Sequence, residues 1–149
     1  MLKKLFAPGN DSFVTSFGLL IFRIWLGLTL MLNHGLAKLE NFKDMSSDFA
    51  DPLGIGPATS LALVIFAEVF ASGLLVLGLA TRFASVVLIV NMGVAFFMVH
   101  KHSLSGQHSG ELAFIYLAGY VMLLLTGPGR ISLDSRIFGG KKAAKAKAD

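Results

Sequence analysis

The chain has no cysteine and few charged residues, since only 15% of its 149 residues are Asp, Glu, Lys or Arg. Without cysteine it can form no disulfide framework, no thiolate metal site and no Cys-x-x-Cys redox pair. Any redox role therefore requires a cofactor. What remains is 54% hydrophobic and includes 13 phenylalanines, which is too apolar for a small soluble domain. We infer a single integral membrane domain.

Four hydrophobic stretches predict membrane-spanning helices, at residues 13–36, 59–80, 83–99 and 111–126. Crossing a hydrocarbon core of roughly 30 Å takes about 20 apolar residues, so the fourth stretch is short. The two-residue turn Thr81-Arg82 makes the second and third spans antiparallel neighbours. The expected fold is all-α, an antiparallel four-helix bundle integral to the membrane that occupies residues 13–135.

The basic residues predict an orientation, because cytoplasmic loops are enriched in Lys and Arg. One side of the expected bundle carries nine of the 13: Lys3, Lys4, Arg82, Arg130, Arg136, Lys141, Lys142, Lys145 and Lys147. The other side carries three: Lys38, Lys43 and Lys101. We therefore place both termini in the cytoplasm. Residues 1–12 form an N-terminal segment, and residues 136–149 are expected to be a disordered basic tail that contacts anionic lipid rather than nucleic acid.

Three spans carry a strongly polar residue near their centres: Arg23, Glu68 and Asn91. A charge at this depth is costly and is retained when it is paired, solvated or used. We expect Arg23 and Glu68 to form an ion pair, because a guanidinium can donate two parallel hydrogen bonds to a carboxylate. Asn91, Tyr116 and Tyr120 are expected in the same layer. Such a layer either fixes helix register or forms a site for a ligand or proton.

A second polar set lies toward the outer side of the expected bundle: Asn33, His34, Lys38, His100, Lys101, His102, His108 and Glu111. His34 follows Arg23 by about three helical turns, so the two share a face. The histidines have three readings. They are interfacial residues without chemistry, metal ligands drawn from His100, His102, His108 and Glu111, or groups that bind a quinone or haem. We assign no metal ligand. Phe42 and Phe49 are expected to fold the first loop over the bundle.

Five segments carry a resemblance to a known family: Arg23-Ile-Trp-Leu-Gly27, His34-Gly35-Leu-Ala-Lys38-Leu39, Glu68 leading into Gly73-Leu-Leu-Val-Leu-Gly78-Leu-Ala-Thr81-Arg82, Asn91-Met92 through His100, and Gly110-Glu111-Leu-Ala-Phe-Ile-Tyr116 ending in Gly127-Pro-Gly-Arg130-Ile-Ser132-Leu-Asp134. In this order they resemble the DoxX family of small four-span membrane proteins, over about residues 13–135. The resemblance implies a bacterial or archaeal membrane protein associated with quinone-linked respiratory or thiosulfate oxidation, or with complexes that manage oxidative stress.

From residues and resemblance together we expect an integral subunit of a quinone-linked oxidoreductase or oxidative-stress system in the bacterial inner membrane. Its quinone would contact Arg23, Glu68, Asn91, Tyr116 and Tyr120, with His34, His100 and Glu111 at the outer mouth. Glu68 or His34 would act catalytically as proton acceptor. Expected partners are membrane lipid, a redox protein and further copies of the chain. The alternatives are a non-catalytic scaffold or assembly protein, haem binding, and transport of a small solute.

Overall fold

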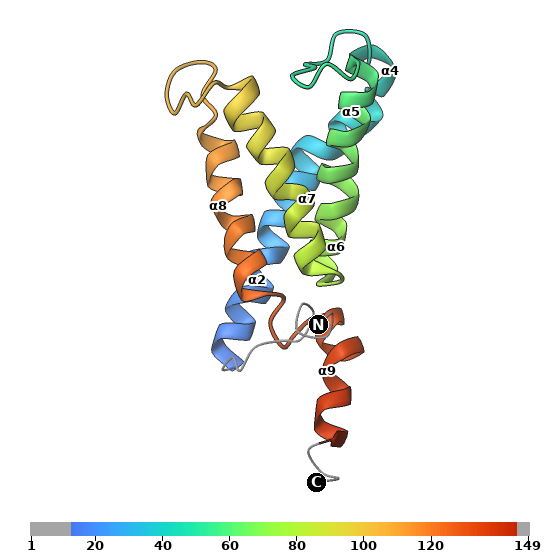
Figure 1. Cartoon of the computed structure of the whole chain (residues 1–149), viewed down its shortest axis with the longest axis vertical. Coiled ribbons are helices and arrows are strands. Elements are labelled where there is room, and N and C mark those ends of the chain that lie inside the picture. Colours follow the sequence, from blue (N-terminus) through green and yellow to red (C-terminus); the bar gives the residue numbers. More distant parts are fainter. Residues whose placement is uncertain (1–12, 146–149) are drawn as a thin grey trace.

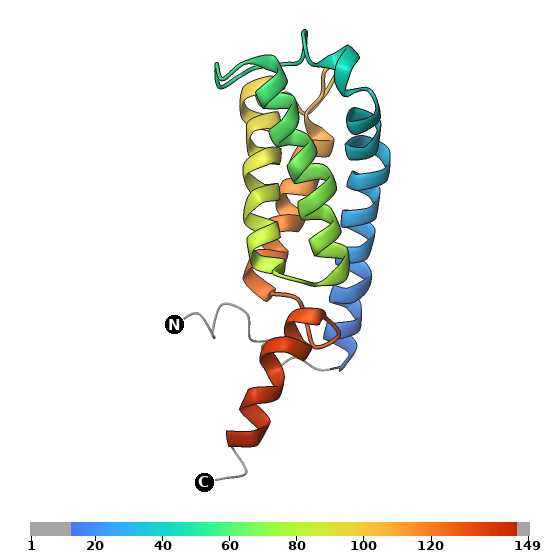
Figure 2. The same cartoon turned by 90° about the vertical axis from the view of Figure 1, so that its right-hand side faces the viewer.

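The computed structural model describes residues 13–145, with side chains as far as residue 139. Within this range the chain forms helices, turns and loops and no strand, so the all-α prediction is confirmed. Phe13–Glu40, Pro57–Leu77 and Thr81–Val99 are long and apolar enough to cross a membrane, and Glu111–Thr126 is a shorter apolar helix. Figures 1 and 2 show these four helices side by side. Two loops lie at one end, here called the loop end, and α9 lies at the other, the α9 end.

The long helices are built from shorter segments whose bounds lie close to those expected. The first comprises α2 (Phe13–Leu30), the π-helix η1 (Met31–Gly35) and α3 (Leu36–Glu40). The second comprises α5 (Pro57–Ile65), η2 (Phe66–Ala71) and α6 (Ser72–Leu77). The third comprises α7 (Thr81–Val94) and η3 (Ala95–Val99), and the fourth is α8 (Glu111–Thr126). A short helix, α4 (Phe42–Met45), interrupts the first loop, and α9 (Leu133–Lys145) ends the described chain.

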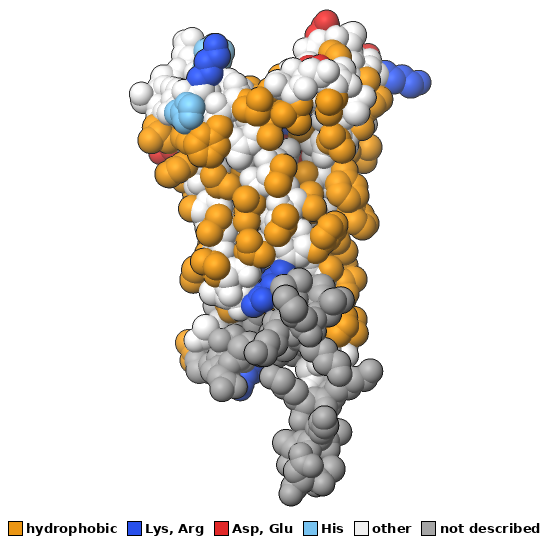
Figure 3. Space-filling model, in the orientation of Figure 1, with side chains coloured by type: hydrophobic (Ala, Val, Ile, Leu, Met, Phe, Trp, Pro, Cys, Tyr) orange, Lys and Arg blue, Asp and Glu red, His pale blue; other side chains and the backbone are white. Residues whose placement is uncertain are grey.

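Large apolar side chains cover the outer surface of these helices. Trp25, Leu125 and Val90 are among the most exposed, at 71%, 72% and 60%. Figure 3 shows such side chains spread over the face in view, between the loops and the atoms drawn in grey. The buried core holds smaller aliphatic residues such as Ala71, Ala84, Leu75 and Leu88. A flank this apolar is suited to lipid rather than water, as expected of a membrane protein.

The turn between the second and third helices lies earlier in the chain than expected, at residues 78–80 instead of Thr81-Arg82. Gly78 takes a left-handed conformation at φ 67°, which ends α6 at Leu77 instead of at Ala80. Ala80 also has a positive φ, of 47°. The carboxylate of Asp134 accepts hydrogen bonds from the backbone N–H groups of Ala80 at 2.7 Å and Thr81 at 2.9 Å. This remote cap lets α7 begin at Thr81 rather than at Phe83.

Arg23 is buried at the α9 end and binds the segment that follows α8. Its guanidinium donates to the carbonyl oxygen of Pro128 at 3.1 Å and to that of Ile131 at 2.6 Å. The head group passes directly over Gly78, where any side chain would overlap it. The N–H of Asp134 in turn donates to the carbonyl of Gly78 at 2.9 Å. We call Arg23, Gly78, Thr81, Asp134 and loop 127–132 the polar junction, since together they join α2, the α6–α7 turn and the start of α9.

The C-terminal segment differs from expectation. A disordered tail from residue 136 was expected, but α9 continues as a helix to Lys145. The physical reason lies in its Ala and Lys residues, which are strong helix formers and offset the cost of Gly139 and Gly140. Asp134 also stands in the first turn of α9, where a negative charge is favourable. Residues 146–149 of the expected tail and the N-terminal segment 1–12 lie outside the described residues.

The polar junction predicts that the stability of the fold depends strongly on Asp134. In Asp134→Ala the amides of Ala80 and Thr81 lose their acceptor in a buried place, which should cost about 1–3 kcal/mol of unfolding free energy. Chemical unfolding of the purified protein in detergent measures this loss. Asp48→Ala is the matched control, because the Asp48 side chain is exposed. An equal loss in both variants would contradict the capping role.

Candidate functional site

A cavity of about 760 Å³ opens at the loop end, and every long helix contributes to its wall. Most of the lining is apolar and comes from Leu30, Leu63, Val64, Phe66, Val86, Val87, Val90, Val94 and Val99, with Phe49, Pro52, Leu53 and Ile55 of the first loop. The polar lining residues are His34, Lys38, Ser60, Glu68, Asn91, His100, Ser109 and Tyr116. Figure 3 shows a hollow between the two loops at this end. An apolar cavity of this size with a few polar groups has the character of a small-molecule site.

The charged centre of this loop-end pocket is an ion pair between Lys38 and Glu68. The Lys38 ammonium nitrogen donates to Glu68 Oε2 at 2.6 Å. The Glu68 side chain is 7% exposed and that of Lys38 is 19% exposed, so the pair is largely shielded from solvent. Gly35 brings the two helices together here, since a Cβ at that position would lie 2.9 Å from the Glu68 carbonyl oxygen. The wall thus holds two opposite charges and the proton between them.

The expected Arg23–Glu68 ion pair is wrong. Close contacts of Gly27 with Val76 and of Gly35 with Glu68 fix the antiparallel register of the first two helices. In that register Arg23 lies level with Gly78, ten residues beyond Glu68, which is roughly 15 Å along the helix axis. Arg23 therefore belongs to the polar junction, and the expected midplane layer of Arg23, Glu68 and Asn91 does not form.

Five of the expected site residues do lie together. His34, Glu68, Asn91, His100 and Tyr116 all line the loop-end pocket. Asn91 is half-buried and lines the cavity from the third helix. His100 is held by a 3.0 Å contact between its Nδ1 and the carbonyl oxygen of His108. Their placement is as expected, whereas a catalytic or ligand-binding role for each stays a prediction.

Two tyrosines of α8 extend inward from the pocket wall. Tyr116 stacks on Tyr120 with ring centroids 5.8 Å apart, and Thr29 of α2 is a hydrogen-bond partner of the Tyr116 hydroxyl. Tyr120 is fully buried, does not line the pocket, and its hydroxyl has no partner among the described residues. The Glu68 carboxylate interacts electrostatically with both hydroxyls. Tyr120 therefore lies behind the site rather than on its surface.

Glu111 lies outside the site. Glu111 is the first residue of α8, and its side chain is exposed. Ser109 and Leu112, on either side of it in the sequence, line the pocket, whereas Glu111 does not. His102 packs its ring against the edges of Phe96 and Phe97. Within residues 13–145 no three His, Asp or Glu side chains are arranged to hold a metal ion.

Three π-helical segments border the loop-end pocket. η1 contributes His34, η2 contributes Phe66, Ala67 and Glu68, and η3 contributes Ala95 and Val99. A π-segment widens the helical turn and rotates the following side chains, and such segments occur often at functional sites. All three long helices depart from α geometry at the level of the same cavity. The sequence has no signal for these segments.

Asp51 organises the loop that covers part of the pocket. Its carboxylate accepts hydrogen bonds from the Ser60 hydroxyl at 2.7 Å, the Gly56 N–H at 2.8 Å and the Ile55 N–H at 3.0 Å. These bonds tie the loop to the first turn of α5, whose own N-cap residue, Gly56, has no side chain. The hydrogen bond from Ser60, followed by those from the backbone, lowers the pKa of Asp51.

Sequence reasoning missed the roles of Lys38, Asp51 and Asp134. Lys38 stands one helical turn after His34, so the shared face was a usable signal that it points into the same pocket. Asp51 stands directly before the proline and glycines of the first loop. Aspartate is common at such a position because its carboxylate can accept hydrogen bonds from the backbone of the following turn. No local signal links Asp134 to Ala80, because the two are 54 residues apart.

The Lys38–Glu68 pair should behave as a coupled unit. Glu68→Gln or Lys38→Met alone leaves one buried charge without its partner and should destabilise the protein, whereas the double variant removes both charges. We expect a coupling free energy of roughly 1–3 kcal/mol from unfolding of the two single variants and the double variant. Strict additivity would show that the pair carries no interaction energy.

Loop order should depend on pH through Asp51. The pKa of Asp51 in the folded protein lies below the ordinary value of an aspartate. The ionised carboxylate therefore contributes fully to the stability of the loop when the pH is above the ordinary pKa, and this contribution is lost as the pH falls through the lowered pKa. Amide hydrogen exchange of residues 54–60 should accelerate in that acidic range. Asp51→Asn should show the faster exchange already at neutral pH, and Asp48→Asn should not. Unchanged exchange in Asp51→Asn would remove this role.

Comparison with known proteins places the chain in a family. A family model described as DoxX matches residues 18–101. The chain is 31% identical to the "Putative oxidoreductase CatD" of Bacillus subtilis over 140 residues, 93% of this chain and 99% of the relative. It is 32% identical to an uncharacterized protein of Haemophilus influenzae over 73% of this chain and 83% of the relative.

A third relative is described as a membrane protein. It is an uncharacterized membrane protein of Mycobacterium tuberculosis, 30% identical over 77% of this chain and 78% of the relative. No solved structure matches the chain. The family model covers more than half of the chain, and the apolar helices described above agree with the membrane description of this relative. The chain is therefore a membrane protein that belongs to the DoxX family.

Proposed function

We propose that the chain is a membrane subunit of a quinone-linked oxidoreductase system and that it binds a quinone, or a ligand of similar shape, in the loop-end pocket. The observation that carries this proposal is a shielded Lys38–Glu68 ion pair on the wall of an otherwise apolar cavity of about 760 Å³. A quinone has an apolar ring and tail and two carbonyl oxygens that accept hydrogen bonds. The name of the Bacillus subtilis relative, an oxidoreductase, supports the same class.

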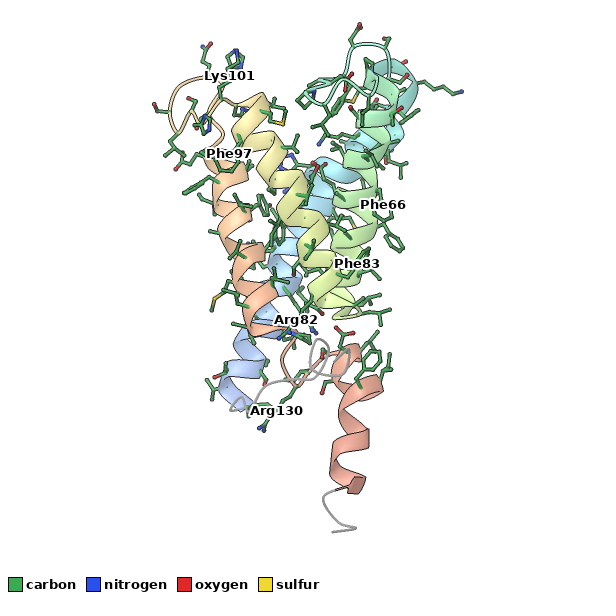
Figure 4. All side chains as sticks on the ribbon, viewed as in Figure 1. Phe66, Arg82, Phe83, Phe97, Lys101 and Arg130 are labelled. Carbon is green, nitrogen blue, oxygen red and sulfur yellow. The ribbon has the colours of Figure 1, made fainter. Side chains whose placement is uncertain are left out.

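Some residues of the second and third helices that line the cavity also reach the exposed flank of the molecule. Leu63 and Phe66 on one side and Val86 and Val90 on the other are exposed and also line the cavity. Figure 4 shows Phe66 pointing outward from its helix. A lipid-soluble ligand can pass between these side chains without crossing water, which favours a ligand that partitions into the bilayer.

The polar residues have distinct roles in this proposal. The Asn91 amide donates to a carbonyl oxygen of the ligand, and the Tyr116 hydroxyl orients the same ring, since both residues line the cavity. Lys38 and Glu68 hold a proton within a 2.6 Å hydrogen bond, and His34 is a second proton-exchanging group. A bound quinone supplies the two-electron, two-proton acceptor chemistry. The electrons come from a redox protein partner, because the chain has no cysteine with which to relay them.

The membrane arrangement belongs to the same proposal. Arg82 and Arg130 lie at the α9 end and Lys101 at the loop end (Figure 4). Because the greater share of the basic residues belongs to the α9 end, we place that end in the cytoplasm of a bacterium and the loop end outside its inner membrane. α8 then acts as the fourth span and completes an antiparallel four-helix bundle. The pocket opens near the outer leaflet.

A second candidate is a non-catalytic scaffold, in which the pair only fixes the register of the first two helices. The close approach of Gly35 to Glu68 favours it, since the pair stands at a contact that the register requires. The two candidates separate on the Lys38→Met/Glu68→Gln double variant. A scaffold folds and recruits its partner with the uncharged Met–Gln pair, whereas a proton-handling site loses quinone-dependent turnover of the complex.

Ligand binding tests the leading proposal directly. A short-chain ubiquinone analogue titrated into the purified protein should bind saturably, and Asn91→Leu, which keeps the size and removes the amide, should weaken binding about tenfold or more. Ala95 lines the cavity, so the larger side chain of Ala95→Phe should fill part of it and prevent the ligand from binding. Ala118→Phe on the exposed face of α8 is the matched control and should bind normally. Wild-type affinity in both Asn91→Leu and Ala95→Phe would refute this site.

A further inference from the structure

A second cavity lies at the α9 end, where three arginines meet the apolar flank. It measures about 500 Å³, and its lining includes Arg23, Arg130 and Arg136 together with Leu20, Val76 and Leu77. Arg130 and Arg136 are exposed, whereas Arg23 is only 2% exposed. The Arg23 Nε is buried and has no partner among the described residues, although both terminal nitrogens of the same guanidinium are bound to carbonyls. This arginine pocket is unrelated to the loop-end pocket.

The charge of the arginine pocket is not balanced by its own wall. Asp134 is the acidic residue that interacts electrostatically with Arg23, but both of its carboxylate oxygens accept backbone hydrogen bonds from Ala80 and Thr81. Asp134 is fully buried and does not line the cavity, and neither does any other described carboxylate. Two exposed guanidinium groups therefore face the cavity without a counter-ion from the described chain.

The apolar half of the pocket identifies the kind of anion. Leu20 and Val76 are half-buried and Leu77 is 55% exposed, so the arginines stand beside a surface that otherwise faces hydrocarbon. A soluble anion makes no use of such a wall, whereas the acyl chains of a lipid pack against it. Guanidinium groups bind phosphate oxygens through pairs of parallel hydrogen bonds. Figure 4 shows Arg130 at the α9 end, beyond Arg82 and at the end of the apolar helices, which is where a lipid head group would lie.

We propose that the arginine pocket binds the phosphate group of an anionic membrane phospholipid. Arg130 and Arg136 contact the phosphate oxygens, Arg23 supports the site from below through its free Nε–H, and the acyl chains run along Leu20, Val76 and Leu77. The bound head group would also stabilise the polar junction, since Arg130 lies in the loop that Arg23 binds and Arg136 lies in α9, near Asp134. The site does not depend on any quinone.

The test uses the full-length protein in detergent with phosphatidylglycerol, phosphatidylcholine or inorganic phosphate as probe. Native mass spectrometry should show retained phosphatidylglycerol, and the thermal midpoint should rise with phosphatidylglycerol more than with phosphatidylcholine. Arg130→Gln/Arg136→Gln should weaken phosphatidylglycerol binding by about tenfold or more, because the variant lacks both exposed guanidinium groups that would contact the phosphate. Both side chains are exposed, so the variant should fold.

Lys43→Gln/Lys101→Gln is the matched control, since it removes the same charge from exposed residues at the loop end. Equal weakening in the control would show general electrostatic attraction and overturn the site, as would wild-type affinity in the arginine variant. No preference for phosphatidylglycerol over phosphatidylcholine would also overturn it. If millimolar inorganic phosphate raises the thermal midpoint as much as phosphatidylglycerol and displaces it, the ligand is a soluble phosphate and the lipid assignment is wrong.

Discussion

The register between the first two long helices is the constraint on which the other contacts depend. Gly27 and Gly35 allow α2 and η1 to approach the second helix closely, and Arg23 secures the far end by passing over Gly78. These three contacts fix the register, which places Lys38 next to Glu68 and Arg23 next to the carbonyl groups of loop 127–132. Small residues thus decide which charges become partners, because they set where the helix backbones touch.

The charges of Arg23, which is buried, and of Lys38, which is partly buried, are stabilised in different ways. Lys38 is neutralised by the carboxylate of Glu68 on the wall of the loop-end pocket. Arg23 is satisfied mainly by backbone carbonyls, and it keeps its full charge while it ties the C-terminal segment to the helices. A lysine ammonium is a compact donor suited to one partner, whereas the guanidinium fork can reach two carbonyls that are three residues apart. The first arrangement places a charged pair on a cavity wall, and the second joins the C-terminal segment to the helices.

The two ends of the molecule are correspondingly different. At the loop end, π-helical segments and a loop held by Asp51 leave a cavity of about 760 Å³. At the α9 end, the junction is closely packed around Gly78 and Asp134, and the smaller arginine pocket opens beside it. Irregular backbone within a membrane protein is tolerated where it lines a cavity or is buried in protein. The irregular helix geometry is therefore concentrated where a ligand would bind.

The sequence by itself determined the all-helical class, the positions of the apolar helices to within a few residues, and most of the pocket-lining polar residues. Hydrophobic length and helix-ending residues such as Gly78 and Pro128 act locally, and five of the expected site residues do gather at one end. Only the tertiary structure decided the pairing of Lys38 with Glu68, the capping of α7 by Asp134 and the exclusion of Arg23, Tyr120 and Glu111 from the pocket surface. These depend on helix register and rotation, which arise from contacts between residues 30 to 108 positions apart and leave no local pattern.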